Sequence, residues 1–148
     1  MRLRPADWLL LIAAIAVPIT LGLDWFTTPG GHESGWSSLG WVTLALILLT
    51  VVLGLATVVL IAVGSRDAVN LPPGVFLAAL IPFALLVTLV VTLLKPGAAT
   101  GIDSGAWIGL IALVALKAGA WLSIRDERVD QPARYVEPPP ARPAPPAA

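Results

Sequence analysis

Cysteine is absent from the 148 residues, and histidine and tyrosine occur once each. The lack of cysteine excludes disulfides, thiolate chemistry and cysteine-rich metal sites. Charged residues make up only 12%, and nine basic side chains balance nine acidic ones. A neutral chain offers no electropositive surface to nucleic acid. We therefore expect no nucleic-acid partner, no cofactor, no metal ion and no catalytic residues.

Long apolar runs dominate the chain instead. They cover about 6–23, 39–63, 73–94 and 105–124. A helix needs about 20 apolar residues to cross roughly 30 Å of hydrocarbon. Lipid leaves helices and closed barrels as the only viable spanning structures, and connections of these lengths join antiparallel neighbours. The sequence predicts an all-α membrane protein, a four-helix up-down transmembrane bundle over residues 1–128.

Arginine lies on alternate sides of these runs. All seven arginines precede the first run, separate the second from the third, or follow the fourth, whereas Lys95 is the basic residue of the opposite gaps. Basic residues near a span tend to stay in the cytoplasm. We therefore expect a multi-pass protein of the plasma (inner) membrane with both termini in the cytoplasm.

The six tryptophans sort to the ends of the runs, as interfacial indoles do. Trp8 and Trp121 fall near the predicted inner boundary, and four others near the outer one: Trp25, Trp36, Trp41 and Trp107. The outer loop also contains His32 beside Glu33. A single histidine is weak evidence for a metal site, so we expect a solvated pair in a loop packed on the bilayer.

Small residues and hydroxyls recur at helical spacing along three of the runs. Such residues allow membrane helices to approach closely, which predicts a packing seam. A hydroxyl-lined pathway for an ion or solute is the alternative interpretation. The predicted seam comprises Thr43, Thr50, Gly54, Thr57, Thr88, Thr92, Ala112, Ala115 and Gly119.

Lys117 is the ionisable side chain deepest within a run, and Pro82 interrupts the third run, freeing the carbonyl near Ala78. A lysine at a helix centre costs about 2.5–3.5 kcal/mol on insertion scales. Helical spacing places Lys117 opposite the seam of its own run, facing lipid or another protomer. We expect it to reach toward anionic lipid phosphates near Trp121, or alternatively to act as a transport charge.

Beyond the last run, residues 129–148 are rich in proline and alanine. Such a segment cannot bury a core and is predicted to be a disordered cytoplasmic tail. Its short P-x-x-P match between Pro140 and Pro143 leaves a docking peptide open as an alternative.

Several short motifs lie at the ends of the predicted spans: Leu23-Asp24-Trp25, Gly35-Trp36, Leu39-Gly40, Gly105-Ala106-Trp107 and the segment from Trp121 to Glu127. With these motifs the chain resembles uncharacterised small four-span integral membrane proteins of actinobacteria. The resemblance covers about residues 4–128 and implies no catalytic or binding residue.

The sequence therefore predicts a non-enzymatic scaffold or accessory subunit that acts through helix packing. Its expected partners are the bilayer, with anionic headgroups, and a second copy or another membrane protein. The alternative is a small transporter or channel component that uses Lys117 and the hydroxyls of the second run.

Overall fold

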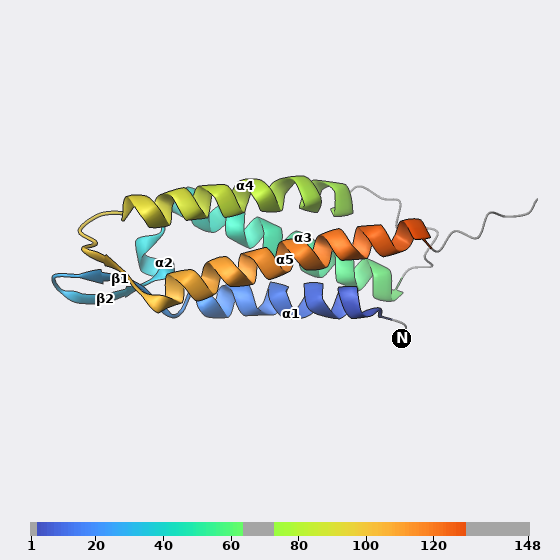
Figure 1. The fold of residues 1–148 in the computed structure, drawn as a ribbon, viewed down its shortest axis with the longest axis horizontal. Helices are drawn as coiled ribbons and strands as arrows, with labels where there is room; N and C mark the ends of the chain where they lie inside the picture. Colours follow the sequence, from blue (N-terminus) through green and yellow to red (C-terminus); the bar gives the residue numbers. More distant parts are fainter. Residues whose placement is uncertain (1–2, 64–72, 130–148) are drawn as a thin grey trace, which may run out of the picture.

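The computed structural model describes residues 3–63 and 73–129. Its longer helices are α1 (Pro5–Thr20), α3 (Trp41–Val63), α4 (Pro73–Leu94) and α5 (Ser104–Val129). They lie along the long axis of the molecule, and each runs opposite to the one before it (Figure 1). The predicted tail from residue 130 onward lies outside the described residues.

Three of these helices are long and apolar enough to cross a membrane, over Trp41–Val63, Phe76–Leu94 and Ser104–Arg125. Helix α1 is apolar but has only 16 residues, a length of about 24 Å at 1.5 Å per residue. The chain is thus mostly helical, with three candidate membrane spans and one shorter apolar helix.

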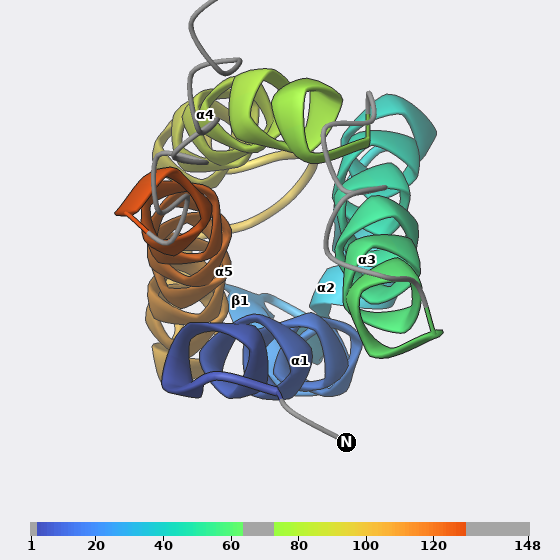
Figure 2. The same cartoon turned by 90° about the vertical axis from the view of Figure 1, so that its right-hand side faces the viewer.

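The four helices form a ring when viewed along the long axis (Figure 2). Helix α1 packs against α3 and α5, and α4 packs against the same two helices. Large apolar side chains also cover the outside of the ring, among them Ile12, Val52, Phe83 and Ile111, each more than half exposed. An apolar exterior of this extent suits hydrocarbon and not water.

Helix α1 ends three residues before the predicted boundary at residue 23. The Leu21 N–H donates to the Val17 carbonyl at 3.2 Å, and the Gly22 N–H donates to the Ile19 carbonyl at 3.0 Å. The Trp25 indole then donates from Nε1 to the Thr20 carbonyl at 2.7 Å. These bonds satisfy carbonyls that a helix end would otherwise leave without donors.

A small antiparallel sheet at one end of the ring was not predicted. It contains β1 (Asp24–Thr28), β2 (Gly31–Ser34) and β3 (Gly101–Ile102) in the order β2-β1-β3. A turn at Pro29 and Gly30 joins β1 to β2, and Gly31 follows with φ 129°, a conformation that favours glycine. The short helix α2 (Gly35–Ser38) comes next. The start of α1 and the end of α5 lie at the opposite end of the molecule (Figure 1).

Candidate functional site

The residues of the predicted seam lie inside the ring. Of the seam residues, all three threonines and the glycine on α3 are buried, as are both threonines on α4. On α5 one alanine and the glycine of the seam are buried, and Ala115 is half-buried. The buried members are Thr43, Thr50, Gly54, Thr57, Thr88, Thr92, Ala112 and Gly119.

The threonine hydroxyls mostly bond to the backbone of their own helix. Thr50 Oγ1 donates to the Ile47 carbonyl at 2.6 Å, and Thr57 Oγ1 donates to the Leu53 carbonyl at 2.7 Å. Thr88 Oγ1 donates to the Ala84 carbonyl on α4 at 2.7 Å in the same way. A hydroxyl that uses its proton for its own helix presents little polarity to the interior. Among the described residues, the buried Thr92 Oγ1 has no hydrogen-bond partner.

Apolar side chains surround the centre of the threonine stripe on α3. A Cβ atom added to Gly54 would lie 3.5 Å from Leu116 Cδ1, 3.7 Å from the Ala14 Cβ and 3.7 Å from Leu10 Cδ1. Leu10, Ala14 and Leu116 are all fully buried. Side chains from α1 and α5 therefore meet α3 between Thr50 and Thr57 and interrupt the stripe.

Helices α1 and α5 approach each other closely at Gly119. A Cβ atom there would lie 2.7 Å from the Leu10 backbone nitrogen and 2.8 Å from its Cα atom. Real side chains do not come this close to backbone atoms, so this contact requires glycine. Ser123, one turn further along α5, donates from Oγ to Asp7 Oδ1 at 2.8 Å.

Asp7 is an acidic side chain that the fold buries. It is 3% exposed near the start of α1. Its second oxygen accepts the Arg4 backbone N–H at 2.9 Å, as expected at the third position of a helix. The two bonds join the first turn of α1 to α5 and supply donors to the buried carboxylate.

Lys117 contacts the carbonyl that Pro82 leaves free. Its Nζ donates to the Ala78 carbonyl at 3.2 Å, in a partly buried position. Proline at position 82 has no N–H to give to the carbonyl four residues earlier, which is that of Ala78. The sequence predicts that this side chain points away from the neighbouring helices. In the structure it lies at the edge of α5 and contacts α4. A lysine within a candidate membrane span and a proline inside a helix thus supply each other with a hydrogen-bond partner.

Trp25 lies beyond the end of α1, as its predicted place at the end of the first run requires, but it is covered by protein. It is 1% exposed, and its indole lies against Gly35 and Gly109, where an added Cβ atom would clash with the ring. The remaining tryptophans, Trp8, Trp36, Trp41, Trp107 and Trp121, are between 43% and 80% exposed. The buried indole therefore fills the sheet end of the ring.

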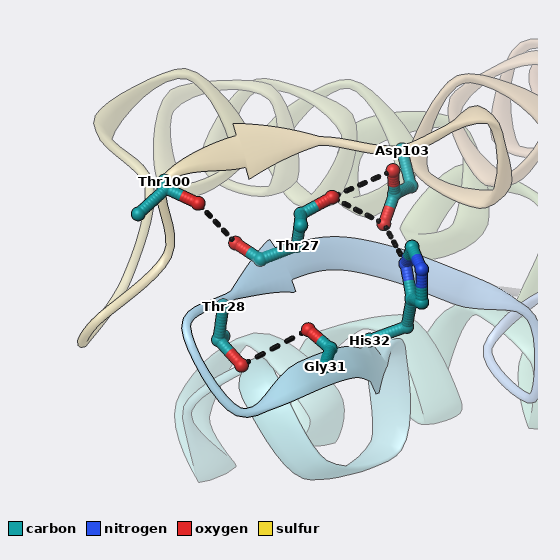
Figure 3. A network of polar contacts seen from close by, with 6 residues as sticks. All are labelled: Thr27, Thr28, Gly31, His32, Thr100 and Asp103. Carbon is teal, nitrogen blue, oxygen red and sulfur yellow. Dashed lines mark hydrogen bonds and ion pairs between the residues drawn. The ribbon is translucent and has the colours of Figure 1, made fainter.

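A network of polar contacts lies in the sheet, outside the helices (Figure 3). His32 Nδ1 lies 2.9 Å from Asp103 Oδ2. The Thr27 hydroxyl donates to both oxygens of Asp103, at 2.9 and 3.0 Å. The Asp103 N–H donates to the Trp25 carbonyl at 2.9 Å. His32 thus pairs with a residue far along the chain and joins β2 to the start of α5.

The pairing shifts both pKa values in the expected directions. The hydrogen bond from His32, with a second from Thr27, lowers the pKa of Asp103 below its ordinary value. The hydrogen bond to Asp103 and its charge raise the pKa of His32, with a smaller contribution from Asp24. Within residues 3–63 and 73–129, no group of three or more His, Cys, Asp or Glu side chains could hold a metal ion. The cluster is suited to fastening the sheet to α5.

Comparison with protein-family models, curated proteins and solved structures yielded no match. What the structure itself defines is a class: a helical protein with three helices able to span a membrane and a polar cap at one end.

Proposed function

We propose that the protein crosses the inner membrane four times and acts as a non-enzymatic scaffold or accessory subunit through helix packing. Helix α1 serves as the fourth span in this proposal. Its length of about 24 Å is extended by buried residues of β1, Trp25 and Phe26. Non-helical backbone is tolerated at membrane depth where protein covers it, as α5 and Gly35 cover Trp25.

The orientation places the sheet outside the cell and both chain termini in the cytoplasm. It is supported by Arg4 and Arg125, at the end where α1 begins and α5 approaches its end, because basic residues near a span tend to stay in the cytoplasm. To test it, Glu33→Cys and Arg125→Cys would be made separately, since the chain has no other cysteine. A membrane-impermeant maleimide should label only the first in intact cells. Labelling of Arg125→Cys before permeabilisation would reverse the orientation.

We favour a scaffold over a channel because apolar side chains fill the interior around Gly54. Leu10 and Leu116 meet at this glycine in the middle of the hydroxyl stripe, and the hydroxyls on either side bond to their own helix. A stripe interrupted in this way favours packing over conduction. A protein partner would therefore bind the apolar outer surface of the helices.

A partner that binds one outer face should be detectable by site-specific cross-linking in native membranes. A photoreactive amino acid would replace Ile12, Val52, Phe83 or Ile111, one exposed residue on each helix, with the buried Leu113 as the control. We expect one helix face to give a discrete cross-linked protein and the control to give none. Uniform cross-linking at all four faces, or none at any, would refute the scaffold proposal.

The alternative is a small transporter or channel component using Lys117 and the α3 hydroxyls. One observation favours it, and it concerns a hydroxyl of the neighbouring helix α4. Thr92 Oγ1 is buried and without a partner among the described residues, as a group that awaits a polar solute would be. Ion flux through vesicles containing the purified protein would test it. If the wild-type protein conducts ions and Lys117→Met does not, the transporter proposal replaces the scaffold proposal. If the wild-type protein shows no flux of common monovalent ions, it does not conduct those ions.

A further inference from the structure

Lys117 brings a positive charge into the apolar part of α5 that the ring does not neutralise. Its Nζ donates to the Ala78 carbonyl, which is an uncharged acceptor. An ammonium group has three N–H donors, so this bond uses one of them. Within residues 3–63 and 76–125, where the structure describes side chains, no carboxylate forms an ion pair with it. The half-buried ammonium therefore has two further N–H donors and a positive charge with which to bind an anion.

Two further residues continue the same edge of α5 toward its C-terminal end. Trp121 and Arg125 follow Lys117 at intervals of four residues, so the three side chains lie on neighbouring positions of one helix face. Trp121 is 59% exposed, and Arg125 is exposed as well. Indole prefers the headgroup boundary, and guanidinium binds phosphate through paired N–H groups.

The surroundings of this face are apolar. Val114, one turn before Lys117 on the same side of the helix, is 52% exposed. A free phosphate would have to leave water to reach Lys117, whereas a phospholipid brings its phosphate to the boundary and places its acyl chains along the helix. Charge and hydrophobicity together select an anionic lipid.

We propose that the α5 face formed by Lys117, Trp121 and Arg125 binds the phosphate headgroup of one anionic phospholipid. Arg125 holds the phosphate at the membrane boundary, and Trp121 packs beside the glycerol region. Lys117 extends toward the same phosphate, and the Ala78 carbonyl holds its ammonium when no lipid is bound. The assignment to the cytoplasmic leaflet rests on the orientation in the proposed function; the site itself does not.

Native mass spectrometry would measure lipid retained from vesicles containing equal amounts of phosphatidylglycerol and phosphatidylcholine with identical acyl chains. The wild-type protein should retain the anionic lipid preferentially. Lys117→Met should lower the ratio of bound anionic to neutral lipid by about fivefold, the effect of one basic residue near a charged surface. Arg125→Gln should act similarly, and Lys117→Arg should preserve the ratio. Lys95→Met, at the opposite end of the molecule, is the matched control.

An unchanged ratio in Lys117→Met and Arg125→Gln would overturn the proposal and reduce Lys117 to a structural bond with α4. An equal fall in the Lys95→Met control would also overturn it, because attraction would then follow net charge alone. If Lys117→Met does not fold, an unchanged ratio in Arg125→Gln decides against the site. Reversed maleimide labelling with an intact lipid preference would refute only the proposed orientation.

Discussion

Two glycines of the packing seam provide a matched pair for measuring how closely the helices approach. Gly119→Ala would place a Cβ atom 2.7 Å from the Leu10 nitrogen, and this neighbour is backbone that cannot rotate away. Gly54→Ala would place its Cβ atom 3.5 Å or more from side-chain atoms, an ordinary van der Waals contact. Both substitutions replace glycine with alanine inside an apolar helix, so the change in helix propensity is shared and cancels in the comparison.

The expected difference follows from the clash. Overpacking in a well-packed interior costs about 1–3 kcal/mol, whereas a methyl group in ordinary contact gains a little dispersion energy. Gly119→Ala should therefore have a free energy of unfolding about 1–3 kcal/mol lower than that of Gly54→Ala. Reversible unfolding in mixed micelles of mild detergent and dodecyl sulfate, followed by helical circular dichroism, would measure both variants.

Equal stability of the two variants would show that α1 does not contact α5 through Gly119, and the α1–α5 packing described above would be wrong. A large loss in Gly54→Ala would instead show that the interior around Leu116 is tighter than the structure has it. Either result would change which helix surfaces remain available to a partner.

Four further predictions concern the ends of the ring. His32 is the single histidine, and nuclear magnetic resonance of untagged protein should show that Asp103→Asn lowers its pKa toward the ordinary value of 6.5; no change would exclude the pairing. Because the pKa of His32 is raised and that of Asp103 lowered, the pair should stabilise the sheet most between those two pKa values. It should weaken as pH rises through the pKa of His32 or falls through that of Asp103, observed as faster amide exchange in β2. Trp25→Phe should lower the free energy of unfolding by about 2–4 kcal/mol, through a lost hydrogen bond and a cavity, and an unchanged unfolding midpoint would place the indole outside the ring. Ser123→Ala should lower it by about 1–3 kcal/mol because the buried Asp7 loses a donor, and an effect below about 0.5 kcal/mol, as for a surface change, would argue against that bond.

Hydropathy alone locates the three longer helices, because a run of about 18 or more apolar residues indicates a helix that spans a membrane. The predicted runs 39–63, 73–94 and 105–124 coincide within a few residues with α3, α4 and α5. The end of α1 was predicted too late, since hydropathy continues through Leu21 and Leu23 while the backbone already turns. Composition cannot show that the Trp25 indole will donate a hydrogen bond to the Thr20 carbonyl at the end of α1.

The sheet had a local signal that hydropathy obscures. Thr27 and Thr28 are β-branched and precede Pro29 and Gly30, a combination typical of a turn between two strands. The partner of His32 had no such signal, because Asp103 lies 71 residues away. The same holds for Asp7 and Ser123, 116 residues apart, whose pairing depends on how α1 and α5 are rotated about their axes.

The contact of Lys117 with α4 shows what single features of a sequence leave undetermined. Pro82 identifies Ala78 as a carbonyl without a helical donor, and Lys117 is a donor without an acid, so each feature by itself suggests a functional site. The structure brings the two together at 3.2 Å and leaves neither wholly unpaired. A polar feature in a membrane helix therefore supports a functional assignment only for the donors and charge that remain after its neighbours are counted. For Lys117 that remainder is two N–H donors and a positive charge, on the helix face that continues with Trp121 and Arg125, and it is the basis of the proposed lipid site.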